Sequence, residues 1–113
     1  MSNDPVKTIS GKVHYFERIA LLPNSTLNVR LLDVSLADAP AQELAVQIIP
    51  NAEKAGLDFN LAYRLADVLN GHTYAIRASI THGDDLIFSS NQHHPVVLGV
   101  DHLKGQNVLV SLV

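Results

Sequence analysis

The chain has 113 residues, the size of one domain, and a chain of this length buries roughly 65% of the surface that it exposes when unfolded. Hydrophobic residues make up 47% and charged residues 17%, which is typical of globular rather than disordered proteins. The net charge is -3 and the eight Lys and Arg residues are scattered, which excludes the concentrated basic face of a nucleic-acid-binding protein. The absence of cysteine excludes disulfides and thiolate chemistry.

Residues 1–7 precede the first alternation of apolar and polar residues. We expect them to be a disordered segment or a remnant of expression, and residues 8–113 to form a single β-sandwich domain. No apolar run approaches the roughly 20 residues that cross a bilayer as a helix, and residues 1–10 lack the pattern of a secretory signal. Two origins stay open: a cytoplasmic chain with Met1 as its native start, or a chain whose leader has been removed.

The first predicted strand covers residues 8–17, and Gly11 within it indicates a bulge or a bend. Apolar and polar residues then alternate with a period of two, as in half-buried strands, over residues 26–34, 43–49, 57–63 and 72–82. The residues predicted to point inward are Leu27, Val29 and Leu31; Leu44, Val46 and Ile48; Leu57, Phe59 and Leu61; and Tyr74, Ile76, Ala78 and Ile80.

The period changes in residues 63–72. Leu65, Val68 and Leu69 recur at spacings of three and four, and Asn70-Gly71 is a typical helix stop. We predict one or two helical turns near residues 64–70 that cover an open end of the sandwich. An irregular loop is the alternative.

Three more strands are predicted over residues 86–90, 95–98 and 107–113. Pro95 would start its strand or lie at a sheet edge, because proline has no N–H to donate to a neighbouring strand. Turn signals such as Pro23-Asn24-Ser25 separate the strands at short intervals. The predicted fold is therefore all-β, an antiparallel β-sandwich of about eight short strands.

Histidines are the first candidates for a metal site. A site needs two or three converging ligands, whereas His93 and His94 are adjacent and would point to opposite faces of an extended segment. We interpret the histidines as surface and loop residues, and we predict no metal and no other cofactor. The six histidines are His14, His72, His82, His93, His94 and His102.

Serines and acidic pairs are the remaining candidates for catalysis. Ser35, Ser89 and Ser90 resemble turn residues, and no serine has the glycine-flanked elbow of a hydrolase. Two acidic pairs could bind a cation or act as acid and base, although a hairpin turn also explains the pair that follows Gly83. We predict no catalytic residue, and no pattern identifies binding residues. The pairs are Asp33 with Asp38 and Asp84 with Asp85.

A family resemblance lies in three segments: GKVHYFERIALLPNSTLNVRLLDVSLADAPAQELAVQII, LDFNLAY and HTYAIRASITHGDDLIFSSNQHHPVVL. Together they resemble the YbaY and YscW type of small lipoprotein domain over residues 11–98, with ERIALLP, LNVRLLDVSLADAP and YAIRASI as the most specific parts. The resemblance implies an antiparallel β-sandwich in the Gram-negative envelope, in the periplasm or at the inner face of the outer membrane. It also implies a lipid-bearing cysteine, which this sequence lacks.

Two classes of function follow from the resemblance and from the lack of a catalytic motif. The first is a non-enzymatic envelope module that resembles pilotins, the chaperones that assist secretin or outer-membrane protein assembly. Its partner would be an envelope protein or peptide, secretin-like by the resemblance, and its sheet edges could also pair two copies into a homodimer. The alternative is an enzyme or ligand carrier for envelope glycans, with polar loops around Asp84, Asn91 and His93, or a stand-alone lipoprotein domain without an assigned role.

Overall fold

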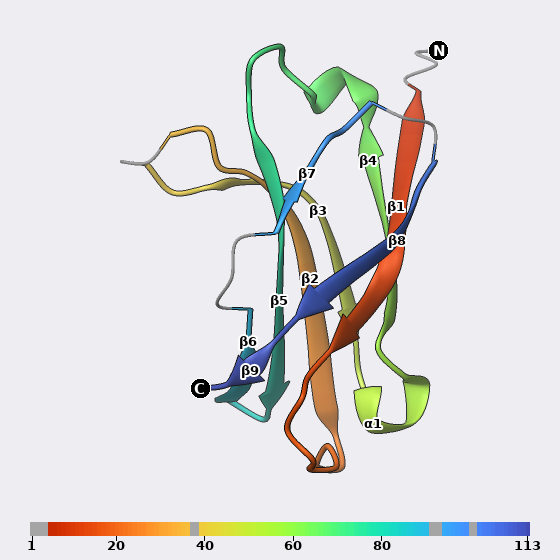
Figure 1. Cartoon of the computed structure of the whole chain (residues 1–113), viewed down its shortest axis with the longest axis vertical. Helices are drawn as coiled ribbons and strands as arrows, with labels where there is room; N and C mark the ends of the chain where they lie inside the picture. Colours follow the sequence, from red (N-terminus) through yellow and green to blue (C-terminus); the bar gives the residue numbers. More distant parts are fainter. Residues whose placement is uncertain (1–4, 37–38, 91–93, 100–101) are drawn as a thin grey trace.

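Two packed β-sheets make up the protein (Figure 1). The computed structural model describes residues 5–36, 39–90, 94–99 and 102–113. The smaller sheet has the order β4 (Asp58–Arg64), β1 (Val6–His14), β8 (His102–Leu109). The larger sheet has the order β3 (Gln42–Ile49), β2 (Ser25–Asp33), β5 (Tyr74–His82), β6 (Asp85–Ser89), β9 (Ser111–Leu112), and β7 (Pro95–Val96) also pairs with β5. The all-β sandwich predicted from the sequence is confirmed.

The strands at the two ends of the chain differ from their predicted bounds. The pattern predicts one strand over residues 107–113, but the chain passes from one sheet to the other at Val110, so β8 and β9 are separate. The fully buried Val110 donates its N–H to the carbonyl of His14 at 2.9 Å, which fixes this crossing. β1 starts at Val6, two residues before the predicted start of the domain at residue 8.

The β1–β8 pair is parallel, whereas the other strand pairs of the described residues are antiparallel. Its register shifts between Ile9 and Gly11, and the extra residue lies on β8, where Gly105 has φ 72°. A Cβ at Gly11 would lie 1.9 Å from the carbonyl oxygen of Gln106. The irregularity predicted at Gly11 is therefore present, because only glycine lets the two backbones come this close.

The core lies between the two sheets and follows the predicted alternation. Leu27, Val29 and Leu31 of β2 have no exposed surface, and Ile76 and Ile80 of β5 are also buried. Burial of each such side chain stabilises the fold by about 1.5–3 kcal/mol. The inward residues predicted for 26–34, 57–63 and 72–82 are all buried or partly buried.

For residues 43–49, the prediction of which side chains point inward is wrong at two positions. Val46 is 44% exposed and Ile48 is 57% exposed. Leu31 pairs with Ala45 and Leu32 pairs with Glu43, so Leu44 is an extra residue in β3. Because one extra residue reverses the facing of a strand, β3 turns Val46 and Ile48 outward beyond this bulge.

Two short helices connect strands. The 3-10 helix η1 (Leu65–Asp67) follows β4 and confirms the helical turn predicted near residues 64–70, although it is only one turn long. No periodicity in the sequence predicts α1 (Ala52–Ala55), but Asn51 and Gly56, both with positive φ, flank it. Neither helix in the described part of the chain is long and apolar enough to cross a membrane.

Candidate functional site

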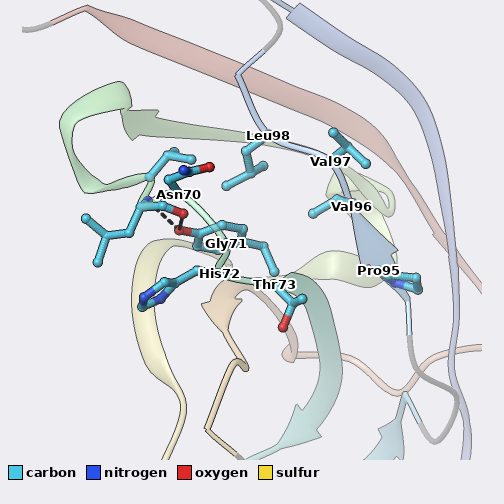
Figure 2. Close-up of a pocket in the computed structure, with 11 residues that line it drawn as sticks. Asn70, Gly71, His72, Thr73, Pro95, Val96, Val97 and Leu98 are labelled. Atoms are coloured by element: carbon cyan, nitrogen blue, oxygen red, sulfur yellow. Dashed lines mark hydrogen bonds between the residues drawn. The ribbon is translucent and has the colours of Figure 1, made fainter.

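A groove lies at the end of the sandwich where the β4–β5 connection runs. Its volume is about 520 Å³, and residues 68–74 form one wall and residues 95–98 the other. Figure 2 shows Val96 and Leu98 directed across the groove toward the first wall. Ligand sites in proteins measure about 300–1,000 Å³, so this groove lies within the usual size range of such sites.

Two tyrosine hydroxyls hold the walls of the groove. The hydroxyl of Tyr74 accepts a hydrogen bond from the N–H of Leu69 at 2.7 Å, which fixes the β4–β5 connection. The hydroxyl of Tyr63 accepts a hydrogen bond from the N–H of Gly99 at 3.0 Å, which fixes the end of the opposite wall. Both tyrosine rings are buried in the core. The walls are thus anchored to the two sheets.

The groove combines an apolar rim with a few polar groups. Leu69 is 51% exposed and Val97 is 80% exposed, on opposite walls. Asn70, His72 and Thr73 add polar groups along the first wall. Such a mixture, in which apolar contact gives affinity and a few polar groups give orientation, is typical of binding sites.

A polar network borders the groove. His72 Nδ1 lies 2.6 Å from Asp33 Oδ2, and Asp33 Oδ1 accepts hydrogen bonds from the N–H and the hydroxyl of Ser35. The Ser35 hydroxyl in turn accepts a hydrogen bond from the N–H of Thr73 at 2.8 Å. The Ser35 hydroxyl, foremost, and the His72 ring hold the pKa of Asp33 below its ordinary value. The network fastens the end of β2 to the β4–β5 connection.

The order of groups in this network does not match a hydrolase triad. The Ser35 hydroxyl donates to Asp33 and not to His72, so the imidazole does not activate it as a nucleophile. Through Ser35 and His72 the network positions one wall of the groove.

Two smaller hollows adjoin the groove. One of about 290 Å³ shares Leu69 with it, and one of about 110 Å³ shares His72. Leu36, which is 71% exposed, borders the smaller hollow. The hollowed surface at this end of the molecule thus extends from β7 across the β4–β5 connection to the β2–β3 connection.

The histidines of the described residues do not gather into one site. His94 contacts the side chain of Gln106, and His14 packs edge-on against Phe16. His102 lies between the hydroxyls of Thr8 and Ser10. Within the ranges that the structure describes, no three His, Cys, Asp or Glu side chains gather where they could hold a metal ion. His93 lies outside the described residues.

Asp33 and Ser35 meet in the polar network, whereas the other described acidic and serine candidates lie apart from it. Asp84 and Asp85 belong to the β5–β6 hairpin, at the end of β5 opposite the groove, and Gly83 has the positive φ of a turn residue. Ser90 Oγ accepts a hydrogen bond from the N–H of Ala78 and so extends the sheet. Ser89 lies in β6 opposite Ser79. Asp38 and Asn91 lie outside the described residues.

The sequence predicts only that residues near 64–70 cover an open end of the sandwich. It does not predict that residues 68–74 form one wall of a groove. The apolar residues of 63–72 give this indication, but nothing in the sequence shows that residues 95–98 lie opposite. That arrangement depends on the pairing of Tyr74 with Val96, which joins segments more than 20 residues apart. The pattern of apolar residues also does not predict that the hydroxyls of Tyr63 and Tyr74 accept hydrogen bonds from the walls of the groove.

The two packed sheets, with the groove between residues 68–74 and 95–98 and the polar network beside it, define a small β-sandwich domain. Residues 4–109 match the type III secretion system lipoprotein chaperone family, YscW, and the chain belongs to this family. The prediction of a YbaY/YscW-type family is confirmed.

Two relatives agree with this assignment. The chain is 34% identical over 90 residues to the uncharacterized lipoprotein YbaY of Escherichia coli strain K12, covering 79% of this chain and 47% of YbaY. It thus spans about half the length of that relative. The structure of an alternative pilotin from the type II secretion system of Vibrio cholerae superposes with a TM-score of 0.79 at 35% identity, covering 94% of this chain and 97% of that one. The chain is a pilotin-like module of the lipoprotein chaperone family.

Proposed function

We propose that this chain is a non-enzymatic module of the bacterial cell envelope that holds a segment of a secretin-like outer-membrane protein in its groove during assembly. The groove between residues 68–74 and 95–98 is the observation that carries the proposal. Membership of a lipoprotein chaperone family and likeness to a pilotin support the class of partner and the place in the envelope.

Physical reasons favour an apolar segment as the ligand. Leu69 and Val97 leave apolar surface in water on both sides of the groove, and its removal from water on binding is favourable. A partner segment with apolar side chains on one face would cover both residues, as helices and strands do in other peptide-binding grooves. The polar groups of Asn70 and Thr73 would then fix its direction.

The test is calorimetric titration of the purified chain with the secretin subunit of the same organism. We expect Leu69→Asp and Val97→Asp each to weaken binding by about tenfold or more, because a charge on the rim would have to be desolvated. Val46→Asp is the matched control, since Val46 is an exposed aliphatic residue on β3 outside the groove. Equal affinity of all four proteins, or loss of binding only in the control, would contradict the proposal.

The glycan enzyme or carrier has less support. Asp84 is at the far end of β5 from the groove, and the Asp33, His72 and Ser35 network is not arranged for catalysis. Turnover of a glycan that persists through repurification and disappears in Asp84→Asn would nevertheless establish it.

A further inference from the structure

Asn70 and Gly71 form an exposed turn in the first wall of the groove (Figure 2). The N–H of His72 donates to the carbonyl of Leu69 at 3.2 Å and closes this turn. Gly71 has φ 82°, a conformation that residues with a side chain rarely adopt, so the turn depends on this glycine. The pair that the sequence predicts to stop a helix thus lies beyond the end of η1, in the wall of the groove.

An asparagine can lose its side-chain amide without any enzyme when the next backbone nitrogen is accessible. The side chain is short, so its Cγ can come close to the nitrogen of the following residue. That nitrogen can then attack Cγ and displace the amide. Asparagine is a thermolabile residue in proteins, and this reaction is one cause. The residue that follows each asparagine therefore decides whether the side chain persists.

Gly71 leaves its nitrogen open to this attack. The residue is exposed, and it has no side chain that could shield its own backbone. Among the residues that the structure describes, the Gly71 N–H donates to no acceptor. No hydrogen bond therefore has to break before the nitrogen reaches the Asn70 side chain.

The other asparagines of the described ranges differ from Asn70 in the residue that follows. At each of them this residue is at most 2% exposed. A residue packed in the core cannot turn its backbone toward the asparagine side chain. The N–H of Ser25, which follows Asn24, also donates to the Glu53 carboxylate at 3.1 Å. The protected pairs are Asn24-Ser25, Asn28-Val29, Asn51-Ala52, Asn60-Leu61 and Asn107-Val108.

We propose that Asn70 is a site of spontaneous modification, at which the side-chain amide becomes a carboxylate in the wall of the groove. The Gly71 nitrogen forms a bond to Asn70 Cγ, the Cγ–Nδ2 bond breaks, and Nδ2 leaves as ammonia with the proton of the Gly71 N–H. A solvent water then opens the five-membered ring at one of its two carbonyl carbons. The product is aspartate when the new bond breaks and isoaspartate when the original peptide bond breaks. Neither step needs an oxidant or a reductant.

The modification changes the groove in two ways. A carboxylate with an ordinary pKa of about 4 is charged at neutral pH, and this charge has to be desolvated when an apolar segment binds beside it. Isoaspartate also adds one carbon atom to the backbone between Leu69 and His72, whose hydrogen bond closes the turn. The effect on a partner rests on the proposed function, whereas the modification itself does not.

Mass spectrometry of the full chain tests the modification. The folded protein is incubated at mildly alkaline pH and digested, and the masses of its asparagine-containing peptides are followed over time. We expect the Asn70 peptide to gain about one dalton, as a hydroxyl replaces the amide nitrogen, and to separate into aspartate and isoaspartate forms. The peptides of Asn24 and Asn107 should stay unchanged.

Asn70→Gln is the matched variant for this experiment. Its side chain keeps the amide but is one methylene longer, so a five-membered ring cannot form and the mass should stay constant. A wild type in which Asn70 stays unmodified, or in which Asn24 and Asn107 are modified as fast as Asn70, would overturn the proposal.

A second measurement tests the effect on the groove. Asn70→Asp carries the charge of the aspartate product from the start, and calorimetric titration with the secretin subunit compares it with Asn70→Gln. We expect Asn70→Asp to bind about threefold or more weakly. Equal affinities of the two variants would overturn the effect on the groove. Failure of the wild type to bind would instead contradict the proposed function, and the result from mass spectrometry would be unaffected.

Discussion

Asp33 shows how one side chain can fix the wall of a groove through hydrogen bonds to its neighbours. Its carboxylate joins Ser35 and His72, and through Ser35 it also fixes the N–H of Thr73 in the wall of the groove. The side chain of Asp33 is only 11% exposed, so loss of its charge would leave hydrogen-bond donors without a partner. The sequence identifies Asp33 as a candidate but pairs it with Asp38, because separation in the chain does not reveal that His72 is its neighbour.

Asp33→Asn should lower stability by about 1–3 kcal/mol at neutral pH, because buried donors lose a charged acceptor. Since the pKa of Asp33 is lowered in the folded state, its contribution is complete above the unfolded value and is lost as pH falls through the folded value. The difference between wild type and variant should therefore narrow below about pH 4. Urea unfolding at several pH values measures this difference. Asp58→Asn, at an 80% exposed side chain, is the control, and an equal pH response in both variants would contradict the role of Asp33.

At the scale of elements, side-chain periodicity predicts most strands, but it does not predict how they pair. The alternation in residues 26–34 and 72–82 identifies β2 and β5, because each buries one face. The parallel pairing of β1 with β8 joins distant segments, and residues 102–106 show little alternation because they are mostly exposed. The bulge at Leu44 arises from pairing with β2, so the outward turn of Val46 is not encoded in β3 itself.

Gly11→Ala should destabilise the protein by about 3 kcal/mol, because its Cβ would lie 1.9 Å from the Gln106 carbonyl oxygen and would push β8 away from β1. Thermal unfolding followed by circular dichroism measures the change. Lys12→Ala, an exposed substitution in the same strand, should stay within about 0.5 kcal/mol of the wild type. Equal melting temperatures for Gly11→Ala and the wild type would show that the two backbones are not in close contact.

The bulge in β3 predicts different responses to truncation of two paired strands. Leu31→Ala should lower stability by about 2–5 kcal/mol, because it leaves a cavity in a fully buried position. Val46→Ala should change stability by less than about 1 kcal/mol, because the side chain lies outside the core. Denaturant unfolding of both variants measures these changes in stability. A large loss of stability in Val46→Ala would mean that the Val46 side chain points into the core, as the alternation in β3 suggests.

For the whole molecule, the sandwich separates two surfaces. The groove lies where the β4–β5 connection meets residues 95–98, and a small apolar pocket lies beneath the β1–β2 connection. The two connections run at opposite ends of the sandwich (Figure 1). Family membership places both surfaces on a lipoprotein chaperone fold. The sandwich thus anchors both walls of the groove, through the hydroxyls of Tyr74 and Tyr63.

The most direct test of this account is a map of the binding surface by nuclear magnetic resonance. The amide signals of the labelled chain are followed while the unlabelled secretin subunit is added. We predict the largest shifts at residues 68–74 and 95–98, with β3 unchanged. Shifts concentrated along β3, or the absence of any shift at the groove when binding is saturated, would contradict the claim that this groove holds the partner.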